Sequence, residues 1–183
     1  DFPAQAVVQF ILSLEQHGIS IWIDGGWAVD ALLGKQTRRH EDLDIVIQEK
    51  DLPLLSNLLH SLGYQDVVRD DTCAWNFVKG NSDGLLVDVH VIVLDAQGNG
   101  IYGPADIGGM YPAPSLSGKG TIAGLSVNCI APEYLVAFHL GYAMDENDYQ
   151  DVAALCARFA IALPLDYLRF VTRAPEPTKD VID

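Results

Sequence analysis

Apolar residues at helical spacing predict two amphipathic helices in the first third of the chain. Residues 3–17 place their apolar side chains three or four positions apart, on one face, and Gly18 ends the repeat. Residues 52–62 carry a similar stripe of leucines, and Asp51 stands where a helix cap is favoured. The two stripes consist of Val7, Phe10, Ile11 and Leu14, and of Leu55, Leu58, Leu59 and Leu62.

Alternating or continuous apolar runs predict about five β-strands. The strongest run is LLVDVHVIVL at residues 85–94, which a turn at residues 81–84 separates from a strand over residues 73–79. The remaining strand-like segments are residues 20–23, 42–47 and 121–130.

The last third of the chain predicts two more helices, over residues 132–144 and 146–159. Residues 95–120 are rich in Gly, Pro, Ser and Ala, which favours an irregular excursion over the surface, in the manner of a lid. We expect a shorter helical piece after Pro164. The predicted organisation is one sheet-containing domain over residues 1–130, a helical extension over residues 131–171 packed on the same core, and a disordered tail over residues 172–183.

A glycine turn between a strand and a helix is the first chemical signal. Asp24, Gly25 and Gly26 follow the strand at residues 20–23, and a helix-like segment runs from Trp27 to Leu33. Backbone N–H groups at a helix N-terminus attract anions, and glycine lets an anion approach closely. The stretch therefore predicts a phosphate cradle.

Three aspartates on two strands are the second signal. Asp42 and Asp44 share one face of their strand, opposite Leu43, Ile45 and Ile47, so they suit a site better than a core. Hard divalent cations prefer such carboxylate oxygens. A phosphate cradle beside metal-binding carboxylates is the minimum equipment for phosphoryl or nucleotidyl transfer.

A third carboxylate stands within the most apolar strand of the chain. Asp88 shares a face with His90, whereas Val87, Val89 and Val91 point the other way. A carboxylate among apolar residues is costly unless it is paired, protonated or bound to metal, so Asp88 is the natural third ligand.

The charge balance limits the partners. The 183 residues contain 25 acidic and 11 basic side chains, a net charge of −14, and 49% of the residues are hydrophobic. Binding along a nucleic-acid backbone needs clustered positive charge, so a nucleic-acid groove is not expected.

The three cysteines, Cys73, Cys129 and Cys156, lack zinc-ligand spacing and are expected to be thiols in a reducing cytoplasm. No run reaches the length of a membrane span and no signal peptide is visible.

The run WIDGGWAVDALLGKQTRRHEDLDI resembles the signature of the small antibiotic nucleotidyltransferases, the lincosamide and aminoglycoside enzymes of the DNA polymerase β-like superfamily. The resemblance continues in LLVDVHVIVLD, TIAGLSVNC and FHLGYAMDENDYQDVAAL, and it covers roughly residues 5–160. The last of these runs is more similar to the short lincosamide enzymes. Asp24 stands where some aminoglycoside members carry glycine. The implied fold is α+β, a mixed β-sheet of about five strands flanked by helices, with C-terminal helices.

The resemblance implies transfer of a nucleoside monophosphate from a nucleoside triphosphate to a hydroxyl of a small molecule, with release of pyrophosphate. Asp42, Asp44 and Asp88 would hold two Mg²⁺ ions, and Asp88 would also serve as general base. Gly25 and Gly26 would bind the terminal phosphates. Further nucleotide contacts would come from the basic loop, from Arg39 with Lys35 or Arg38, and from His40.

Several side chains stay open to two interpretations. Asp24, Asp30, His90 and Tyr142 are candidate substrate contacts, but helix capping, surface exposure or core packing would also account for them. A lincosamide acceptor is expected ahead of an aminoglycoside. The alternatives are a non-catalytic nucleotide-binding or toxin–antitoxin-type module of the same fold, and transfer onto a protein side chain. The protein is expected to be a monomer or a homodimer.

Overall fold

The computed structural model describes residues 1–141, 143–165 and 167. Tyr142, the predicted tail and most of the helical piece expected after Pro164 lie outside the described residues. The helices are α1 (Ala4–Gln16), α2 (Gly25–Leu33), η1 (Glu49–Asp51), α3 (Leu52–Ser61), η2 (Ala113–Ser117), α4 (Pro132–His139) and α5 (Glu146–Phe159), of which η1 and η2 are 3₁₀ turns. The strands are β1 (Ile21–Ile23), β2 (Asp42–Gln48), β3 (Gln65–Val67), β4 (Asn76–Gly80), β5 (Leu86–Leu94), β6 (Gly100–Tyr102), β7 (Gly109–Tyr111), β8 (Gly118–Ile122) and β9 (Leu125–Cys129).

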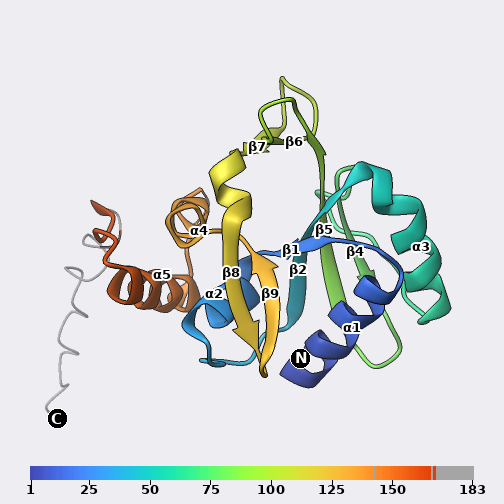
Figure 1. Cartoon of the computed structure of the whole chain (residues 1–183), viewed down its shortest axis with the longest axis horizontal. Helices are drawn as coiled ribbons and strands as arrows, with labels where there is room; N and C mark the ends of the chain where they lie inside the picture. The colour runs from blue at the N-terminus through green and yellow to red at the C-terminus, as the bar shows by residue number, and fades with distance from the viewer. Residues whose placement is uncertain (142, 166, 168–183) are drawn as a thin grey trace, which may run out of the picture.

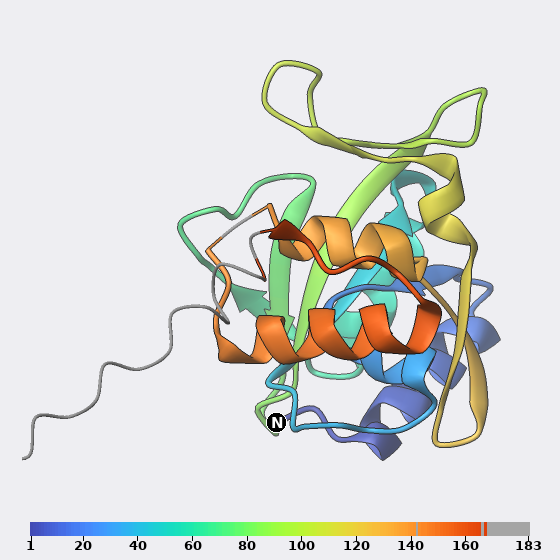
Figure 2. The ribbon, with the colours of Figure 1, turned by 90° about the vertical axis from the view of Figure 1, so that its left-hand side faces the viewer.

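The described strands form one mixed sheet in the order β3-β4-β5-β2-β1-β9-β8, with β6 and β7 continuing from the end of β5. Strand β2 runs parallel to β5, and β1 runs parallel to β9, whereas the other pairings are antiparallel. Figure 1 shows α1 and α3 on one side of this sheet and α2, α4 and α5 on the other. Figure 2 shows α4 and α5 lying in front of the sheet. The α+β class and the mixed sheet are therefore confirmed.

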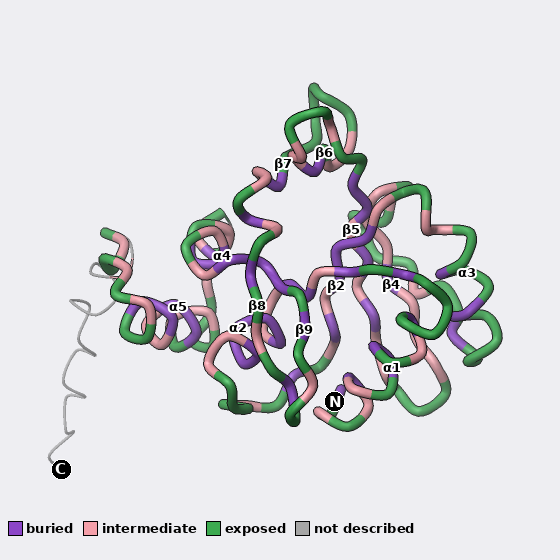
Figure 3. The backbone as a smooth tube through the Cα atoms, in the orientation of Figure 1, coloured by how far each residue is buried: buried purple, intermediate pink, exposed green. Residues whose placement is uncertain are grey.

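The predicted apolar stripes build the core. Strands β2 and β5 alternate buried and half-buried residues, and β5 ends in the exposed residues Val93 and Leu94 (Figure 3). Burying each large apolar side chain contributes roughly 1.5–3 kcal/mol, so these stripes fix the strand register. The fully or nearly fully buried side chains of the two helical stripes and the two central strands are Val7, Phe10, Ile11, Leu14, Leu55, Leu58, Leu59, Leu43, Ile45, Ile47, Val87, Val89 and Val91.

The sheet is larger than the sequence predicted. Strand β3 was not expected, because its residues are polar and mostly exposed and therefore lack the apolar alternation that marks a strand. The expected irregular excursion over residues 95–120 contains β6, β7 and the start of β8. These strands are only three to five residues long and begin at glycine, which conceals their pattern.

Two smaller expectations also change. Asp51 is the residue before α3, but its side chain makes no capping hydrogen bond, and Pro53 in the first turn accounts for the helix start instead. The predicted strand over residues 73–79 begins at Asn76, preceded by a single bridge between Cys73 and Asn76. Within the described part of the chain, no helix has the length and hydrophobicity that a membrane span requires.

Candidate active site

Strands β2 and β5 bring the predicted carboxylates together. Their parallel register sets Asp44 opposite Asp88, and Asp42 lies two residues earlier on the same face. Asp44, Asp88 and His90 each offer one donor atom such that all three atoms lie within 4.8 Å of one another. The expectation that carboxylates from two neighbouring strands converge on one side of the sheet is confirmed.

Arg69, from the loop after β3, reaches the same cluster. Its Nη1 lies 3.3 Å from Asp88 Oδ2, and its Nη2 lies 4.0 Å from Asp42 Oδ2. Sequence reasoning missed Arg69, because a single arginine in a polar loop carries no periodic or motif signal. Its guanidinium neutralises part of the negative charge of the cluster.

Burial and crowding raise the pKa of two of the acids. The pKa of Asp44 is raised well above its ordinary value, first by burial and then by the neighbouring charges of Asp42, Asp24 and Asp88. The pKa of Asp88 is also raised by burial, an effect that His90 and Arg69 oppose. A site that resists ionisation of its own carboxylates favours an added cation.

The glycine turn lies directly against this cluster. Gly25 has φ +57° and begins α2, and a Cβ built on it would lie 2.1 Å from Asp44 Oδ2. Asp24 accepts a hydrogen bond from Gly25 N (2.9 Å), and the backbone N–H of Asp24 donates to Asp44 O (3.0 Å). Because Asp24 engages the N–H of Gly25, the free end of the cradle is shifted toward Gly26.

A hydrogen-bonded chain connects the helix cap to the acids. The Tyr111 hydroxyl donates to Asp24 Oδ2 at 2.9 Å and lies 3.3 Å from His90 Nδ1. The Tyr111 hydroxyl therefore links the carboxylate of Asp24 to the imidazole ring of His90. Nε2 of His90 lies 3.6 Å from Asp88 Oδ1 and 3.9 Å from Asp44 Oδ1. Sequence reasoning missed Tyr111, which lies in the segment expected to be irregular.

A cavity of about 370 Å³ opens beside the cluster. Its walls are mainly aromatic: the His90 ring stacks on Tyr102 at 5.7 Å, and Tyr111 meets Phe138 edge-on at 5.4 Å. Asp24, Asp44 and His90 supply its polar side. The cavity therefore offers an apolar wall within reach of the reacting groups.

The residues fit a divalent cation. Asp88 Oδ1 and His90 Nε2 are buried atoms without a hydrogen-bond partner among the described residues, and they face each other. Unpaired buried polar atoms are costly, and a cation would bind the Asp88 oxygen together with a deprotonated Nε2 of His90. Carboxylate oxygens predominate in the cluster, as hard cations such as Mg²⁺ require, and the imidazole nitrogen also suits Mn²⁺.

The structure does not bring the rest of the predicted nucleotide-binding set to the acids. Lys35 is exposed beyond the C-terminal end of α2, the end opposite Gly25. The Arg39 side chain is 88% exposed and pairs with Asp1 at 3.4 Å. Neither Lys35 nor Arg39 contacts the acids in this structure, so their nucleotide contacts stay a prediction.

His40 and Asp30 have structural partners instead. His40 is buried, with Nε2 2.5 Å from Asp30 Oδ2 and its ring 4.7 Å from that of Trp27. Asp30 is also buried and accepts from Thr37 N at 3.0 Å and from Thr37 Oγ1 at 2.5 Å. These contacts fasten the basic loop to α2, so Asp30 is not placed to touch substrate.

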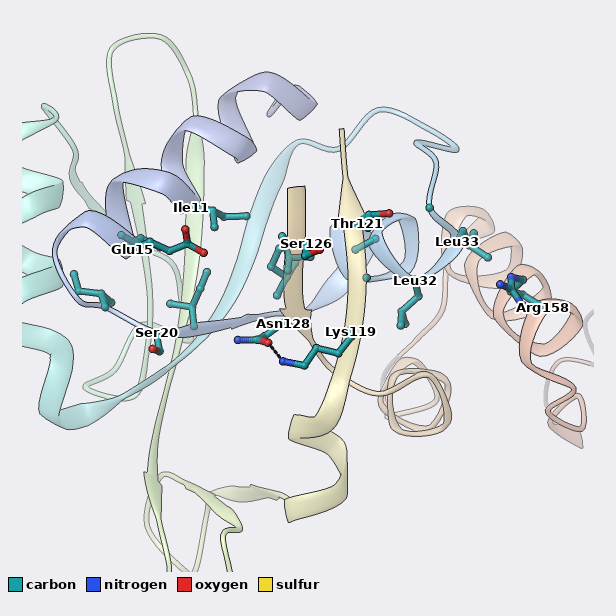
Figure 4. A pocket seen from close by; sticks show the side chains of 18 residues that line it. Ile11, Glu15, Ser20, Leu32, Leu33, Lys119, Thr121, Ser126, Asn128 and Arg158 are labelled. Atoms are coloured by element: carbon teal, nitrogen blue, oxygen red, sulfur yellow. Dashed lines mark hydrogen bonds between the residues drawn. The ribbon is translucent and has the colours of Figure 1, made fainter. Parts of the chain in front are cut away.

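A larger cavity lies elsewhere in the described structure. It has a volume of about 710 Å³ and lies between α1, the end of α2 and the β8–β9 hairpin (Figure 4). Ile11, Leu32 and Val127 contribute apolar surface, and Lys119, which hydrogen-bonds Asn128, lies at its rim. None of the acids of the cluster lines it, so volume alone does not locate the chemistry.

Comparisons with known proteins identify the family of the chain. A family model described as aminoglycoside-2''-adenylyltransferase matches residues 6–155. A lincosamide resistance protein of Staphylococcus haemolyticus is 30% identical over 147 residues, which cover 80% of this chain and 90% of that protein. The crystal structure of the lincosamide antibiotic adenylyltransferase LnuA, with lincomycin bound, superposes with a TM-score of 0.71 and 26% identity over 85% of this chain and 96% of that one.

A further solved structure shares the fold. ANT(2")-Ia in complex with adenylyl-2"-tobramycin superposes with a TM-score of 0.71 and 22% identity, covering 93% of this chain and 97% of that one. The family match spans most of the sequence and includes the glycine turn and all three aspartates. The chain belongs to the aminoglycoside-2''-adenylyltransferase family of antibiotic nucleotidyltransferases.

Proposed function

We propose that this protein transfers a nucleoside monophosphate from a nucleoside triphosphate to a hydroxyl of a small antibiotic and releases pyrophosphate. The observation that carries the proposal is the convergence of Asp44 and Asp88, with Asp42 beside them, against the first turn of α2. Carboxylates for metal thus adjoin backbone N–H groups for phosphate, as phosphoryl-group transfer requires.

Mg²⁺, held by Asp42, Asp44 and Asp88, would supply charge neutralisation and Lewis acidity at the phosphates; we propose two ions. The first turn of α2, at Gly26, binds the terminal phosphates. The oxygen of the acceptor hydroxyl attacks the α-phosphorus, the bond from that phosphorus to the bridging oxygen breaks, and pyrophosphate leaves with its electron pair. Asp88, whose pKa is raised by burial, takes the hydroxyl proton as the general base.

The cavity next to the acids supports a lincosamide acceptor ahead of an aminoglycoside. Its aromatic walls, Tyr102, Tyr111 and Phe138, suit a ligand with an apolar face. A polycationic aminoglycoside needs several free carboxylates, but Asp24 is already engaged by Tyr111 and by Gly25. The Staphylococcus relative, a lincosamide resistance protein, is consistent with this choice.

Helix α4 completes the acceptor cavity, since its residues Leu135, Phe138 and His139 line it. We therefore propose that residues 1–130 hold the nucleotidyltransferase machinery and that residues 131–171 form a helical extension on the same core. We also propose a cytoplasmic monomer or homodimer, because nucleoside triphosphates are cytoplasmic and the cysteines are free thiols. The net charge of −14 supports an acceptor other than nucleic acid.

The test is pyrophosphate release in the presence of ATP, Mg²⁺ and a panel of lincosamides and aminoglycosides. We expect release with lincosamides, and we expect Asp42→Asn to slow it by about a hundredfold or more, because several kcal/mol of transition-state stabilisation depend on the ion this side chain holds. Nucleotide binding without release would favour a non-catalytic module. Transfer of label from ATP to the protein in place of the drug would favour a side-chain acceptor.

A further inference from the structure

An ion pair between distant parts of the chain lies beside the phosphate cradle. Arg38 Nη2 donates to Asp151 Oδ2 of α5 at 2.8 Å, across a separation of 113 residues. The Asp151 side chain is 4% exposed and that of Arg38 is 27% exposed, so the pair is largely shielded from water. Shielded pairs of this kind fix the direction of a guanidinium far better than exposed ones do.

The pair holds the guanidinium against the first turn of α2. A Cβ built on Gly26 would lie 2.7 Å from Arg38 Nη2, so only glycine at this position lets the side chain lie so close to the helix. Arg38 Nη1 also donates to Arg39 O at 3.2 Å, which fixes the second terminal nitrogen of the guanidinium. Two separate contacts thus hold the guanidinium at the end of the helix where the proposed phosphates bind.

The guanidinium keeps donors for a ligand. An arginine has five N–H donors, and the two bonds described occupy only two of them. The Nε atom is buried and has no partner among the described residues. Asp30 and Asp145 add negative charge nearby and, with Asp151, raise the pKa of Arg38, which burial opposes. A buried donor without a partner next to an anion cradle is an incomplete hydrogen-bond arrangement.

We propose that Arg38 binds the terminal phosphates of the nucleoside triphosphate and that Asp151 is the positioning residue that holds it in place. The inference rests on the proposed function, since it takes the polyphosphate of that substrate as the ligand. It assigns the C-terminal helix α5 a role in nucleotide binding. It also replaces Arg39, whose side chain points into solvent.

The test uses inorganic tripolyphosphate with Mg²⁺ as the probe, titrated by calorimetry into the whole protein and four variants. We expect Arg38→Gln to weaken binding about tenfold to a hundredfold, the loss typical of charge-assisted hydrogen bonds. We expect Asp151→Asn to weaken it by several-fold. Arg39→Gln is the matched control, a neighbouring exposed arginine, and its affinity should stay within about twofold of wild type.

The double variant Arg38→Gln/Asp151→Asn separates positioning from a general structural effect. If Asp151 acts only through Arg38, the double variant binds tripolyphosphate as Arg38→Gln does, whereas independent effects would add. In turnover assays, Asp151→Asn should raise the KM for ATP and leave kcat nearly unchanged. Additive losses, or an Arg39→Gln effect as large as that of Arg38→Gln, would overturn the assignment.

Two outcomes distinguish this inference from the proposed function. Wild-type binding of tripolyphosphate with equal affinity for Arg38→Gln would overturn the inference and leave the transferase proposal standing. No tripolyphosphate binding by wild type, together with no pyrophosphate release from ATP, would remove both. The Arg38→Gln variant tests the inference even if Asp151→Asn does not fold, because Arg38 is partly exposed. The melting temperature of Arg38→Gln can be compared with that of Arg39→Gln.

Discussion

Gly25 and Asp44 lie so close that no residue larger than glycine fits at position 25. A Cβ on Gly25 would lie 2.1 Å from Asp44 Oδ2, and the backbone at Gly25 has φ +57°. The phosphate cradle and the metal-binding carboxylates are therefore one packed unit, in which the position of the turn sets the position of the carboxylate.

Gly25→Ala is expected to lower turnover by about a hundredfold, because the new methyl group displaces Asp44 and strains the left-handed backbone by roughly 1–3 kcal/mol. Gly63→Ala is the matched control, since Gly63 also has a positive φ (+78°) but open space around it. Both variants should lose stability in thermal melts, and only Gly25→Ala should lose pyrophosphate release. Equal pyrophosphate release by the two variants would show that the turn at Gly25 does not set the position of Asp44.

Asp44→Asn is expected to stabilise the metal-free protein at neutral pH while abolishing turnover. The folded-state pKa of Asp44 is raised, so the folded protein gains stability as pH falls through that pKa and loses it as pH rises. Asparagine removes the ionisation and its cost. In the presence of a chelator, the melting temperature of the variant should exceed that of wild type at pH 8, and the difference should become smaller toward acidic pH. A difference that does not depend on pH would contradict the burial and crowding of Asp44.

Arg69→Gln is expected to tighten divalent-cation binding by about two- to fivefold, the range that a partly exposed ion pair contributes. The guanidinium contacts Asp88 and Asp42, so it competes with a cation for the same carboxylates. Calorimetric titration with Mn²⁺ measures the change. Lys79→Gln, which removes the distant pair with Asp66, serves as the control and should leave the affinity unchanged. Weaker Mn²⁺ binding by Arg69→Gln would mean that Arg69 supports the ion.

Tyr111→Phe is expected to lower kcat by about tenfold, since the loss of one hydroxyl removes its bonds to both Asp24 and His90. The aromatic contact with Phe138 is kept, so the fold and the KM for ATP should not change. Tyr134→Phe, on the same aromatic cluster but outside the cavity, is the comparison. A kcat equal to that of Tyr134→Phe would show that the chain through Tyr111 does not orient His90.

The parts that could be predicted from the sequence are those that local pattern determines. A few neighbouring residues suffice to recognise the apolar stripe of α1, the alternation in β2 and the isolated Asp88 in an apolar strand. The same pattern constrains strand pairing, because a slip by one residue would turn Leu43 or Val87 away from the core.

The parts that could not be predicted depend on partners far away in the chain. Arg38 and Arg39 are adjacent and equivalent in sequence, and only the contact with Asp151 distinguishes them. Arg69 and Tyr111 come from segments without hydrophobic periodicity. Their positions in the site depend on how β3 and β7 join the sheet. Short glycine-rich strands carry too few side chains to mark that path.

The most direct measurement of the central claim is the mass of the acceptor after incubation with the protein, ATP and Mg²⁺. With lincomycin, we predict an increase equal to one adenylyl group on the drug, formed by wild type and not by Asp88→Asn. An unmodified drug beside bound ATP, or a drug adenylylated equally by Asp88→Asn, would contradict the account in which the acids of β2 and β5 act together.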